Sequence, residues 1–455
     1  MKAAFRAFGA FCLAILGLYI VPLFLPLTSV QEARRAEIVQ EAVRFGHWLV
    51  PHLNGQPYVT KPPLHPWLAG ALAWALGLSE PVLRLPSLLS AAGILALTYL
   101  LARRLGGTLA AFLALLFLLA APRFYFFAHR VELEMLLAFF FTAYLYGAFL
   151  YLRSGNLRPL LWAFLSFSAG LLTKGPFILL ALSPVVAFGF LTRERRTLSL
   201  LHPLALLLSA TPALAWYLYL YHRLGGGNFG EFVRVDLLGR LTTGKRDPFY
   251  HYAGALLLGF LPESLLLLRA QAFLRLHLAE RDRLFLLLCW LVPLLLLSFT
   301  AAKFSKYLLS LYPFFAISLA LAAANWFREK ERLVRQVALF LALGLLVGAL
   351  FSEIRGNALR FESLKRARPY LSAPKVYFYG RPNYLLVFYR GGPIPVLKGP
   401  PFPPGIILQE TRQGLAPLDQ GLQFLREISP FYRKGKVLRV YSSAGASSAS
   451  SGSGK

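Results

Sequence analysis

The segment between the first two hydrophobic runs, residues 31–68, carries side chains that could act on a phosphorylated lipid. Cations and carboxylates share it: Arg34, Arg35, Lys61, Glu32 and Glu37. The segment is too polar to cross a bilayer, so these side chains are expected at the membrane surface. Arginine and lysine donate charge-assisted hydrogen bonds to phosphate, and a carboxylate can orient or deprotonate an attacking group.

Further charged residues occur at the ends of hydrophobic runs rather than in their middles. They are Glu132, Glu134, Lys174, Asp236, Arg240, Lys303 and Lys306. Charge at the centre of a span costs roughly 2.5–3.5 kcal/mol per residue on insertion scales, and charge at an end costs less. A single lysine or arginine here is equally well explained as a snorkelling anchor. The whole set, on one side of the membrane, is better explained as a receptor for an anion such as phosphate.

Glu132 and Glu134 begin a strongly apolar run. Two residues correspond to about 200° on a helix, so at most one of the two carboxylates faces inward if both are helical. A negative charge at a helix N-terminus is favourable by itself, and this explanation covers Glu132 well. Glu134 lies deeper in the run and fits a binding-site role better.

The lysines of the later turns lie in very short connections. Lys174 precedes Gly175 and Pro176 between two hydrophobic runs, which predicts a sharp reversal with proline at the start of the next helix. Lys303 and Lys306 lie in a second short turn of the same kind. A lysine in so tight a turn is either exposed or aimed into a cleft.

The elements that must position these residues are hydrophobic helices. The 455-residue chain is 57% hydrophobic and 15% charged, which is typical of a polytopic membrane protein. We expect an all-α protein with about eleven transmembrane helices in residues 1–351 and a long first outer loop at 28–82. The expected spans lie near 7–27, 83–102, 106–122, 133–152, 158–172, 176–191, 200–221, 252–268, 284–299, 306–324 and 333–351. Part of the first loop, 32–45, has apolar residues at helical spacing opposite a charged face and is expected as an interfacial helix.

The net charge of +28 follows the membrane topology and not a nucleic-acid surface. With the N-terminus in the cytoplasm, the arginine-rich loops after alternate spans all fall on the cytoplasmic side, as the positive-inside rule requires. The first hydrophobic run lacks a small-residue cleavage site and is expected to be a retained signal anchor. We therefore expect a multi-pass protein of the cytoplasmic (inner) membrane with its functional loops on the extracytoplasmic side and no nucleic-acid partner.

Residues 352–442 have a different pattern and are expected to form a small extracytoplasmic α/β domain. Strands are predicted at 376–379, 385–389, 406–409 and 437–440, and a helix at 416–428. This domain is a candidate for acceptor choice. Residues 443–455 are a serine- and glycine-rich flexible tail with the composition of an engineered linker.

Common cofactor and metal motifs are absent from the sequence. No CxxC, HExxH or P-loop occurs, and the eight histidines show no ligand spacing. Cys12 and Cys289 lie in apolar runs and are expected to be small core residues. We expect no cofactor, and we consider a divalent metal improbable.

Several of these motifs together resemble the GT-C-fold glycosyltransferases that use polyprenyl-phosphate sugars, in particular the aminoarabinose transferases and protein O-mannosyltransferases. The family pattern D-E-x-R-Y-A-E-I corresponds to Gln31–Ile38, and G-x-W-x-x-P-x-L-N-G-x-x-Y corresponds to Gly46–Tyr58. The matches continue at Thr60-Lys61-Pro62-Pro63-Leu64, Glu134-Met135-Leu136-Leu137, Lys174-Gly175-Pro176 and Ser298 through Lys303, Tyr307 and Pro313. They follow the family order over about 300 residues; the first-loop match is specific and the others are individually weak.

The resemblance implies roles for individual residues. The substrate-binding residues would be Gln31, Arg34, Lys61, Lys174, Arg240, Lys303 and Tyr307, with Arg34 and Lys61 on the lipid phosphate. The catalytic carboxylate would be Glu32 or Glu134. The sequence departs from the family because the leading Asp is Gln31 and the acid before Lys-Pro-Pro is Thr60. Neither glutamine nor threonine can be a general base, so the base has moved, the acceptor needs no strong base, or activity has been lost.

The resemblance implies an inverting transfer of a sugar from a polyprenyl (undecaprenyl) phosphate to an extracytoplasmic lipid, glycan or protein. The charge placement alone supports only the binding of a lipid phosphate among membrane lipids. The alternative is a non-catalytic protein of the same scaffold that binds or translocates such a lipid, and the two altered acidic positions favour it.

Overall fold

The computed structural model describes residues 15–443 except positions 16, 28, 226–246, 302, 414, 416–417, 419–421, 430 and 432–435. The chain divides into two compact units. The first comprises residues 1–20, 59–68 and 84–349, and the second comprises 21–58, 69–83 and 350–455. The first part of the expected span 7–27, residues 7–14, lies outside the described residues; towards its end it forms the 3-10 helix η1 (Val21–Phe24).

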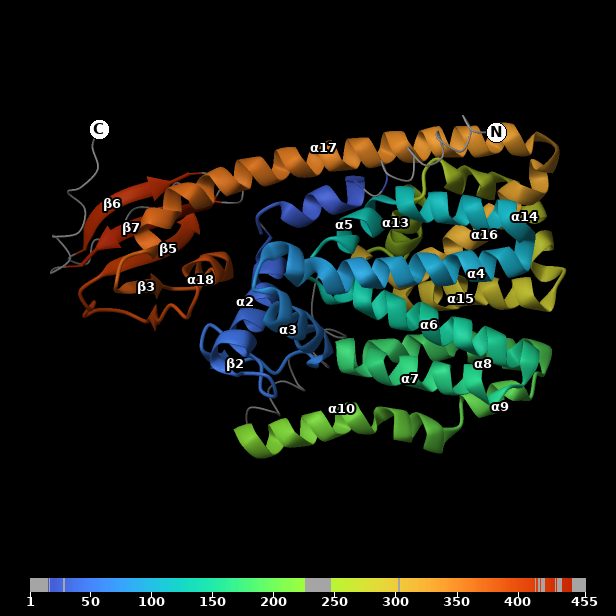
Figure 1. The fold of residues 1–455 in the computed structure, drawn as a ribbon, viewed down its shortest axis with the longest axis horizontal. Helices are drawn as coiled ribbons and strands as arrows, with labels where there is room; N and C mark the ends of the chain where they lie inside the picture. Colours follow the sequence, from blue (N-terminus) through green and yellow to red (C-terminus); the bar gives the residue numbers. More distant parts are fainter. Residues whose placement is uncertain are drawn as a thin grey trace. The chain divides into compact units, whose positions relative to one another are not determined.

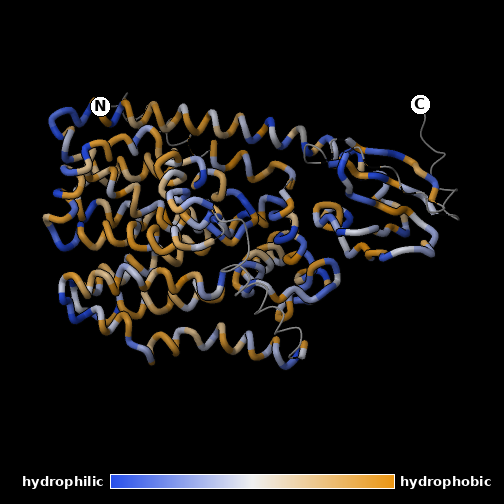
Figure 2. The backbone as a smooth tube through the Cα atoms, turned by 180° about the vertical axis from the view of Figure 1, so that it is seen from behind, coloured by the Kyte–Doolittle hydropathy of each residue, from blue (hydrophilic) through white to orange (hydrophobic). Residues whose placement is uncertain are grey.

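The first unit consists of helices (Figure 1). In chain order they are α4 (Glu80–Ala120), α5 (Pro122–Ala128), α6 (Leu133–Ser154), α7 (Leu157–Lys174), η2 (Gly175–Ala181), α8 (Leu182–Thr192), α9 (Arg196–Leu200), α10 (Pro203–Leu224), α13 (His251–Gly259), η4 (Glu263–Arg269), α14 (Ala270–Leu278), α15 (Arg281–Ser298), η5 (Ser305–Leu311), α16 (Tyr312–Trp326), η6 (Arg328–Lys330) and the start of α17 (Glu331–Leu371). Figure 2 shows that hydrophobic residues dominate the long helices of this unit. Helices α6 and α16 are apolar all round and form its buried core.

Six helices among the described residues are long and apolar enough to cross a membrane, or seven if the bent pair His251–Gly259 and Glu263–Leu278 is one span. Part of the difference from the expected eleven arises because neighbouring runs join. The expected spans 83–102 and 106–122 both lie in α4, which breaks at Gly107 with φ 76° and ψ −168°. The expected spans 158–172 and 176–191 lie in the continuous stretch Leu157–Thr192.

The sharp reversal predicted after Lys174 is confirmed. Gly175 has φ +65°, a backbone conformation that favours glycine, and Pro176 lies in the first turn of η2. The chain folds back so closely that a Cβ placed on Gly170 would lie 2.6 Å from the side chain of Ile178. The turn therefore fixes the position of Lys174 at the end of α7.

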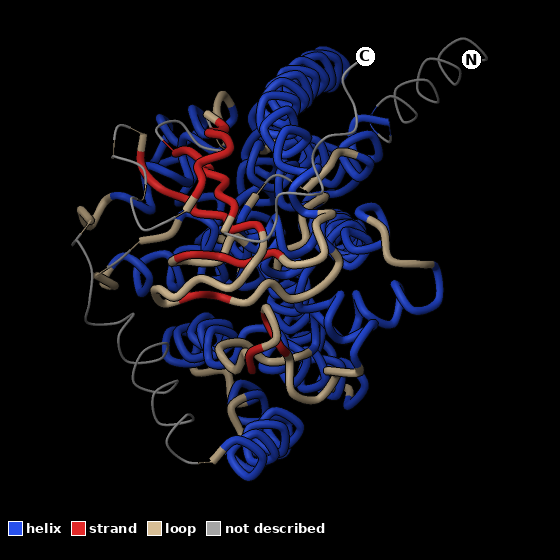
Figure 3. Tube along the Cα trace, turned by 90° about the vertical axis from the view of Figure 1, so that its left-hand side faces the viewer, coloured by secondary structure: helices blue, strands red, loops and turns tan. Residues whose placement is uncertain are grey.

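The second unit contains α2 (Val30–Phe45), the hairpin β1 (His52–Leu53) with β2 (Gln56–Pro57), α18 (Tyr384–Arg390) and a five-stranded sheet. Helix α3 (Leu64–Leu76) begins in the first unit and ends in the second. The sheet order is β4-β3-β5-β7-β6, built from β3 (Val376–Tyr379), β4 (Val396–Leu397), β5 (Ile406–Arg412), β6 (Gln423–Ile428) and β7 (Lys436–Ser442) (Figure 3). β3 pairs in parallel with β4 and β5, while β7 pairs antiparallel with β5 and β6.

Three sequence expectations in this unit differ from the structure. Residues 385–389 were expected as a strand but form α18, which Asn383 caps by accepting a hydrogen bond from the backbone N–H of Leu385. The run 416–428 was expected as a helix, but its end forms the strand β6 because it pairs with β7. The helix expected to end at 351 continues to Leu371.

Helix α2 was expected to lie at the membrane interface with its charged face in water. The helix is present, but its charged face is buried: Glu37 and Glu41 are each 1% exposed. The reason is that this face packs against the hairpin and α18. Gln40 donates a hydrogen bond to the carbonyl of Phe388, and Arg44 donates one to the carbonyl of Gly391.

Candidate active site

A buried ion cluster in the first unit is centred on Glu134. The Nζ of Lys306 lies 2.7 Å from Oε1 of Glu134, and the Nζ of Lys174 lies 3.1 Å from the same oxygen. Lys306 also approaches Oε2 of Glu132 at 3.6 Å. The side chains of Glu134 and Lys174 are 5% and 7% exposed. Because both charges are withdrawn from water, each depends on the other for its stabilisation.

Glu132 and Glu134 can share a partner because only Glu134 has helical backbone angles, while Glu132 precedes the helix. Glu132 is the N-cap of α6, with extended backbone angles of φ −138° and ψ 156°, and Leu133 is the first helical residue. The 200° separation expected for two helical residues therefore does not apply. Lys306 was recognised as an unusual cation in the sequence but was not assigned to the site, and the three-residue spacing from Lys303 gave no reason to prefer it.

Lys174 is further fixed by aromatic rings. Its Nζ lies 4.4 Å from the ring centroid of Tyr307 and 5.1 Å from that of Phe177, and these two rings are 5.1 Å apart. An ammonium over an aromatic face gains about 0.5–2 kcal/mol, more when water is excluded. The structure thus brings together three of the expected residues, Glu134, Lys174 and Tyr307.

Lys61 lies on the segment 59–68, which belongs to the same unit. A Cβ placed on Gly175 would lie 4.0 Å from Cγ of Pro62, so this segment meets the turn after Lys174. Lys61 and Lys174 are near enough for their charges to repel. Lys61, Lys174 and Lys306 thus bring three ammonium groups into the neighbourhood of the carboxylate of Glu134.

Lys303 was expected to bind phosphate, but its ammonium group is bonded to backbone carbonyls. Its Nζ donates hydrogen bonds to the carbonyls of Asp247 at 3.0 Å and Thr300 at 2.7 Å. Its backbone N–H donates to Oδ2 of Asp247 at 3.1 Å. The side chain is 9% exposed, and these bonds close the turn that leads into η5. Arg240 and Asp236 lie outside the described residues.

The other expected residues of the first loop, Gln31, Glu32 and Arg34, belong to the second unit, on α2. The guanidinium carbon of Arg34 lies 5.3 Å from the ring centroid of Tyr384 on α18. The Nε of Arg34 is buried and has no hydrogen-bond partner among the residues that the structure describes. Gln31 is exposed, whereas Glu32 is fully buried. Arg34 thus keeps a donor available on a guanidinium whose plane is held by an aromatic ring.

A second carboxyl pair lies on the same helix and was not assigned from the sequence. Oε1 of Glu37 accepts a hydrogen bond from the backbone N–H of Asn54 at 2.6 Å, and Oε1 of Glu41 accepts one from Gly55 at 2.6 Å. Burial, and a hydrogen bond between the two carboxyl groups, raise the pKa of Glu37 to about 10. The pair holds the tip of the hairpin, where Asn54 and Gly55 have positive φ.

These arrangements support anion binding better than strong base catalysis. The carboxylate of Glu134 is shared by two ammonium groups, which disfavours its taking up a proton. An anion that enters beside Lys61 meets several ammonium groups. The aromatic rings of Phe177 and Tyr307 form an apolar wall next to that charge.

Comparison with known proteins shows similarity to a glycosyltransferase family model and to several curated relatives. A family model described as dolichyl-phosphate-mannose-protein mannosyltransferase matches residues 60–222. The undecaprenyl phosphate-alpha-4-amino-4-deoxy-L-arabinose arabinosyl transferase of Pectobacterium carotovorum is 32% identical over 331 residues, 69% of this chain and 58% of that protein. An uncharacterized protein of Aquifex aeolicus is 31% identical over 292 residues, 63% of this chain and 57% of that protein. The chain therefore spans less than two thirds of the length of these relatives.

Solved structures share the fold. The crystal structure of ArnT from Cupriavidus metallidurans bound to undecaprenyl phosphate superposes with a TM-score of 0.79 at 18% identity, over 96% of this chain and 98% of that chain. The archaeal oligosaccharyltransferase AglB from Archaeoglobus fulgidus, in complex with an inhibitory peptide and a dolichol-phosphate, gives a TM-score of 0.53 at 14% identity, over 86% of this chain and 64% of that chain.

Proposed function

Because this chain belongs to the GT-C-fold family of polyprenyl-phosphate-sugar-dependent glycosyltransferases, we propose that it transfers a sugar from a polyprenyl phosphate to an acceptor, with inversion. The acceptor oxygen attacks the anomeric carbon, the bond from that carbon to the phosphate oxygen breaks, and the polyprenyl phosphate leaves with the electron pair. The observation that carries the proposal is the group of lysines gathered around Glu134.

Lys61 binds the phosphate in this proposal, and Arg34, in the second unit, stays a predicted phosphate ligand. Charge accumulates on the leaving phosphate oxygen as the bond breaks, and a fixed cation stabilises that charge more in the transition state than before it. Two features support Arg34: its buried Nε lacks a partner among the described residues, and Tyr384 orients the guanidinium. Lys61 is supported by its place beside the Glu134 cluster, where its charge acts on that of Lys174.

Glu134 positions Lys174 and Lys306 and is a poor candidate for a strong base. The fully buried Glu32 is the other carboxylate that could orient the acceptor. An acceptor that already carries an ionised group, such as a phosphate, needs no proton removed and only a weak base or none. We therefore propose an anionic acceptor, which also accounts for Gln31 and Thr60 at positions where the family has acids. The ammonium groups of the cluster would attract such an acceptor.

We further propose the membrane arrangement. The chain lies in the cytoplasmic (inner) membrane, with the Glu134 cluster at the extracytoplasmic boundary and the basic loops in the cytoplasm. The reversal at Gly175 separates two crossings in Leu157–Thr192, and the break at Gly107 separates two in α4, which supports a total near the expected eleven. Residues 352–442 form an extracytoplasmic α/β domain.

The alternative function is binding or translocation of the lipid without transfer. Two observations favour it. Gln31 and Thr60 stand where the family has acidic residues. The Glu134 carboxylate is already paired with Lys174 and Lys306. Transfer of labelled sugar from polyprenyl phosphate in proteoliposomes separates the two, with phosphate-bearing and neutral acceptors tested side by side. Stoichiometric lipid binding with no transfer to any acceptor would establish the alternative.

The matched variants for this experiment are Lys61→Ala and Lys398→Ala, since Lys398 is an exposed lysine beside β4. We expect Lys61→Ala to lower kcat/KM for the donor about 100-fold, the loss that removal of one such charge-stabilising group produces. Lys398→Ala should match the wild type. Equal transfer by all three proteins would remove Lys61 from the phosphate site.

A further inference from the structure

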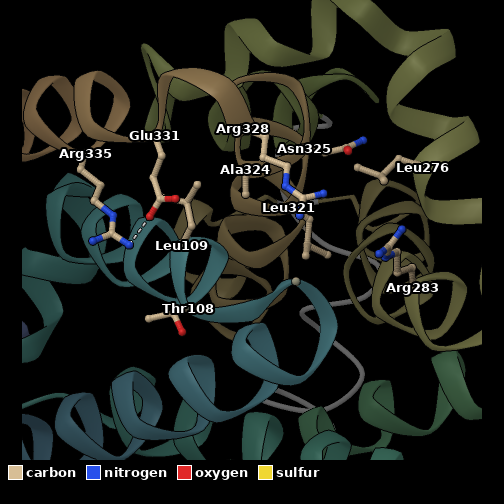
Figure 4. A pocket seen from close by; sticks show the side chains of 11 residues that line it. Thr108, Leu109, Leu276, Arg283, Leu321, Ala324, Asn325, Arg328, Glu331 and Arg335 are labelled. Carbon is tan, nitrogen blue, oxygen red and sulfur yellow. Dashed lines mark ion pairs between the residues drawn. The ribbon is translucent and has the colours of Figure 1, made fainter.

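A second site lies at the opposite end of the helices from the Glu134 cluster. A cavity of about 460 Å³ opens where the break in α4, the end of α14, the start of α15 and the connection from α16 to α17 meet (Figure 4). Lys306 and Asn325 lie at the two ends of the apolar stretch Ser305–Trp326, which at 1.5 Å per residue separates them by about 30 Å. The cavity is therefore not part of the site described above.

Three arginines supply the positive charge in the lining of this cavity. Arg283 comes from α15, Arg328 from η6 and Arg335 from α17, and Glu331 is the one carboxylate that lines it. Glu331 pairs with Arg335, as the dashed line in Figure 4 marks. Arg283 is 3.3 Å from Glu280, a side chain that is 57% exposed and lies outside the lining. The lining itself thus carries three positive charges and one negative charge.

Two of these guanidinium groups have an N–H donor that makes no hydrogen bond to the described residues. The Nε atoms of Arg283 and Arg335 are buried and have no hydrogen-bond partner among the residues that the structure describes. A buried donor without an acceptor costs about 1–3 kcal/mol. An anion that accepts hydrogen bonds from several directions would recover this cost at both arginines.

We propose that this arginine pocket binds a phosphate ester. The planar fork of a guanidinium matches phosphate oxygens in pairs, and pockets of this size hold small ligands or head groups. Leu109, Leu276 and Leu321 add an apolar wall suited to the carbon atoms next to a phosphate. The phosphate belongs either to the head group of an anionic phospholipid or to a soluble phosphorylated molecule.

The position of the pocket favours the phospholipid. Basic pockets between membrane helices on the cytoplasmic side attract anionic head groups. Under the positive-inside arrangement, Arg283, Arg328 and Arg335 lie at that boundary, where the inner-leaflet phosphates are. Binding here does not depend on the proposed sugar transfer, since no residue of the Glu134 cluster takes part.

The test measures lipid binding by the purified full-length protein. Native mass spectrometry and thermal unfolding are recorded with phosphatidylglycerol and with phosphatidylcholine. We expect one tightly held phosphatidylglycerol, a Tm raised by several degrees, and at least a tenfold weaker affinity in Arg283→Gln/Arg328→Gln. The matched control is Arg158→Gln/Arg195→Gln, which removes two exposed arginines from the same predicted side outside the pocket. Equal phosphatidylglycerol affinity in both double variants would overturn the proposal.

Two further arms complete the test. The single variant Arg328→Gln changes an exposed residue on η6 and keeps the test decisive if the double variant does not fold; it should weaken binding at least threefold, and unchanged binding would count against the pocket. Inorganic pyrophosphate is titrated with and without phosphatidylglycerol. Displacement of the lipid by pyrophosphate supports the phosphate contact; pyrophosphate binding without lipid binding assigns the pocket to a soluble ligand. Binding of neither anion would exclude the site.

Discussion

Oε1 of Glu134 holds the ammonium of Lys306 at 2.7 Å while it also holds the ammonium of Lys174 at 3.1 Å. One oxygen atom thus connects α6, the end of α7 and the start of η5. These three segments are far apart in the sequence, and their side chains meet at a single buried point. The relationship makes Glu134 the residue on which the geometry of the cluster depends.

Replacing Glu134 with glutamine should destabilise the protein strongly. Lys174 would then be a buried ammonium with no carboxylate at its Nζ, and removal of one partner of a buried pair costs about 3–5 kcal/mol. The matched control is Glu362→Gln, which removes an exposed i,i+4 pair with Arg366 and should cost less than about 1 kcal/mol. Denaturant unfolding in mixed micelles measures both variants.

The double variant Glu134→Gln/Lys174→Met provides a second check on the same pair. It removes both charges, so its cost should be smaller than the sum of the two single costs. Additive effects would mean that the ion pair does not hold the cluster together.

Lys303→Ala should act on stability and not on donor recognition. Its ammonium donates to the carbonyls of Asp247 and Thr300, and loss of these two hydrogen bonds costs about 1–3 kcal/mol in total. We expect a lower Tm and a donor KM within about threefold of the wild type. A KM rise as large as that of Lys61→Ala would restore Lys303 to the phosphate site. Asp247→Ala, which loses only the bond from the backbone N–H, should lower the Tm less.

The carboxyl pair of α2 should make stability depend on pH. The pKa of Glu37 is raised from 4.5 to about 10, so the folded protein keeps a proton that the unfolded chain releases. The stabilisation is complete below pH 4.5 and is lost as the pH rises toward 10, by at most about 1.4 kcal/mol per pH unit. Glu37→Gln removes this titration, so its Tm should fall less than that of the wild type between pH 6 and 9. Parallel Tm curves for the two proteins would show that Glu37 does not hold the proton.

Gly170→Ala should disturb the reversal that presents Lys174. The added methyl group would lie 2.6 Å from Ile178, and overpacking of this kind costs about 1–3 kcal/mol. The double variant Gly170→Ala/Ile178→Val should recover part of that loss, because Cδ1 of Ile178 lies only 2.7 Å from the new methyl group and valine lacks it. Ile178→Val alone is the control. If the double variant is no more stable than Gly170→Ala, the close approach at this turn is not the cause.

Local patterns in the sequence were sufficient for the main helices and for part of the site. The run after Glu134 predicts α6, and the Lys-Gly-Pro pattern predicts the reversal at Gly175. Short apolar runs were less informative: 385–389 is apolar throughout, so it fits a buried strand or a buried helix equally well. Asn383 before it and Gly391 after it are the capping signals that distinguish the two.

The partners within the site depend on contacts between distant segments, which periodicity does not report. Lys303 and Lys306 look alike in the sequence, and only the packing of η5 against α6 decides which of them meets Glu134. The burial of Glu37 and Glu41 could not be predicted either, because a polar helix face normally indicates solvent. It is explained by the hairpin, whose backbone N–H groups take the place of water.

Because α18 contacts α2, removal of the C-terminal residues would also affect the first loop. Tyr389 accepts a hydrogen bond from the backbone N–H of Leu27, and the side-chain amide of Asn54 both donates to and accepts from the backbone of Ile394. Removing residues 356–442 would strip the aromatic support from Arg34 and leave these polar groups open to solvent or lipid. Under the proposed function, a shortened protein would lose donor affinity and acceptor choice together, and only point changes on the outer strands could separate the two.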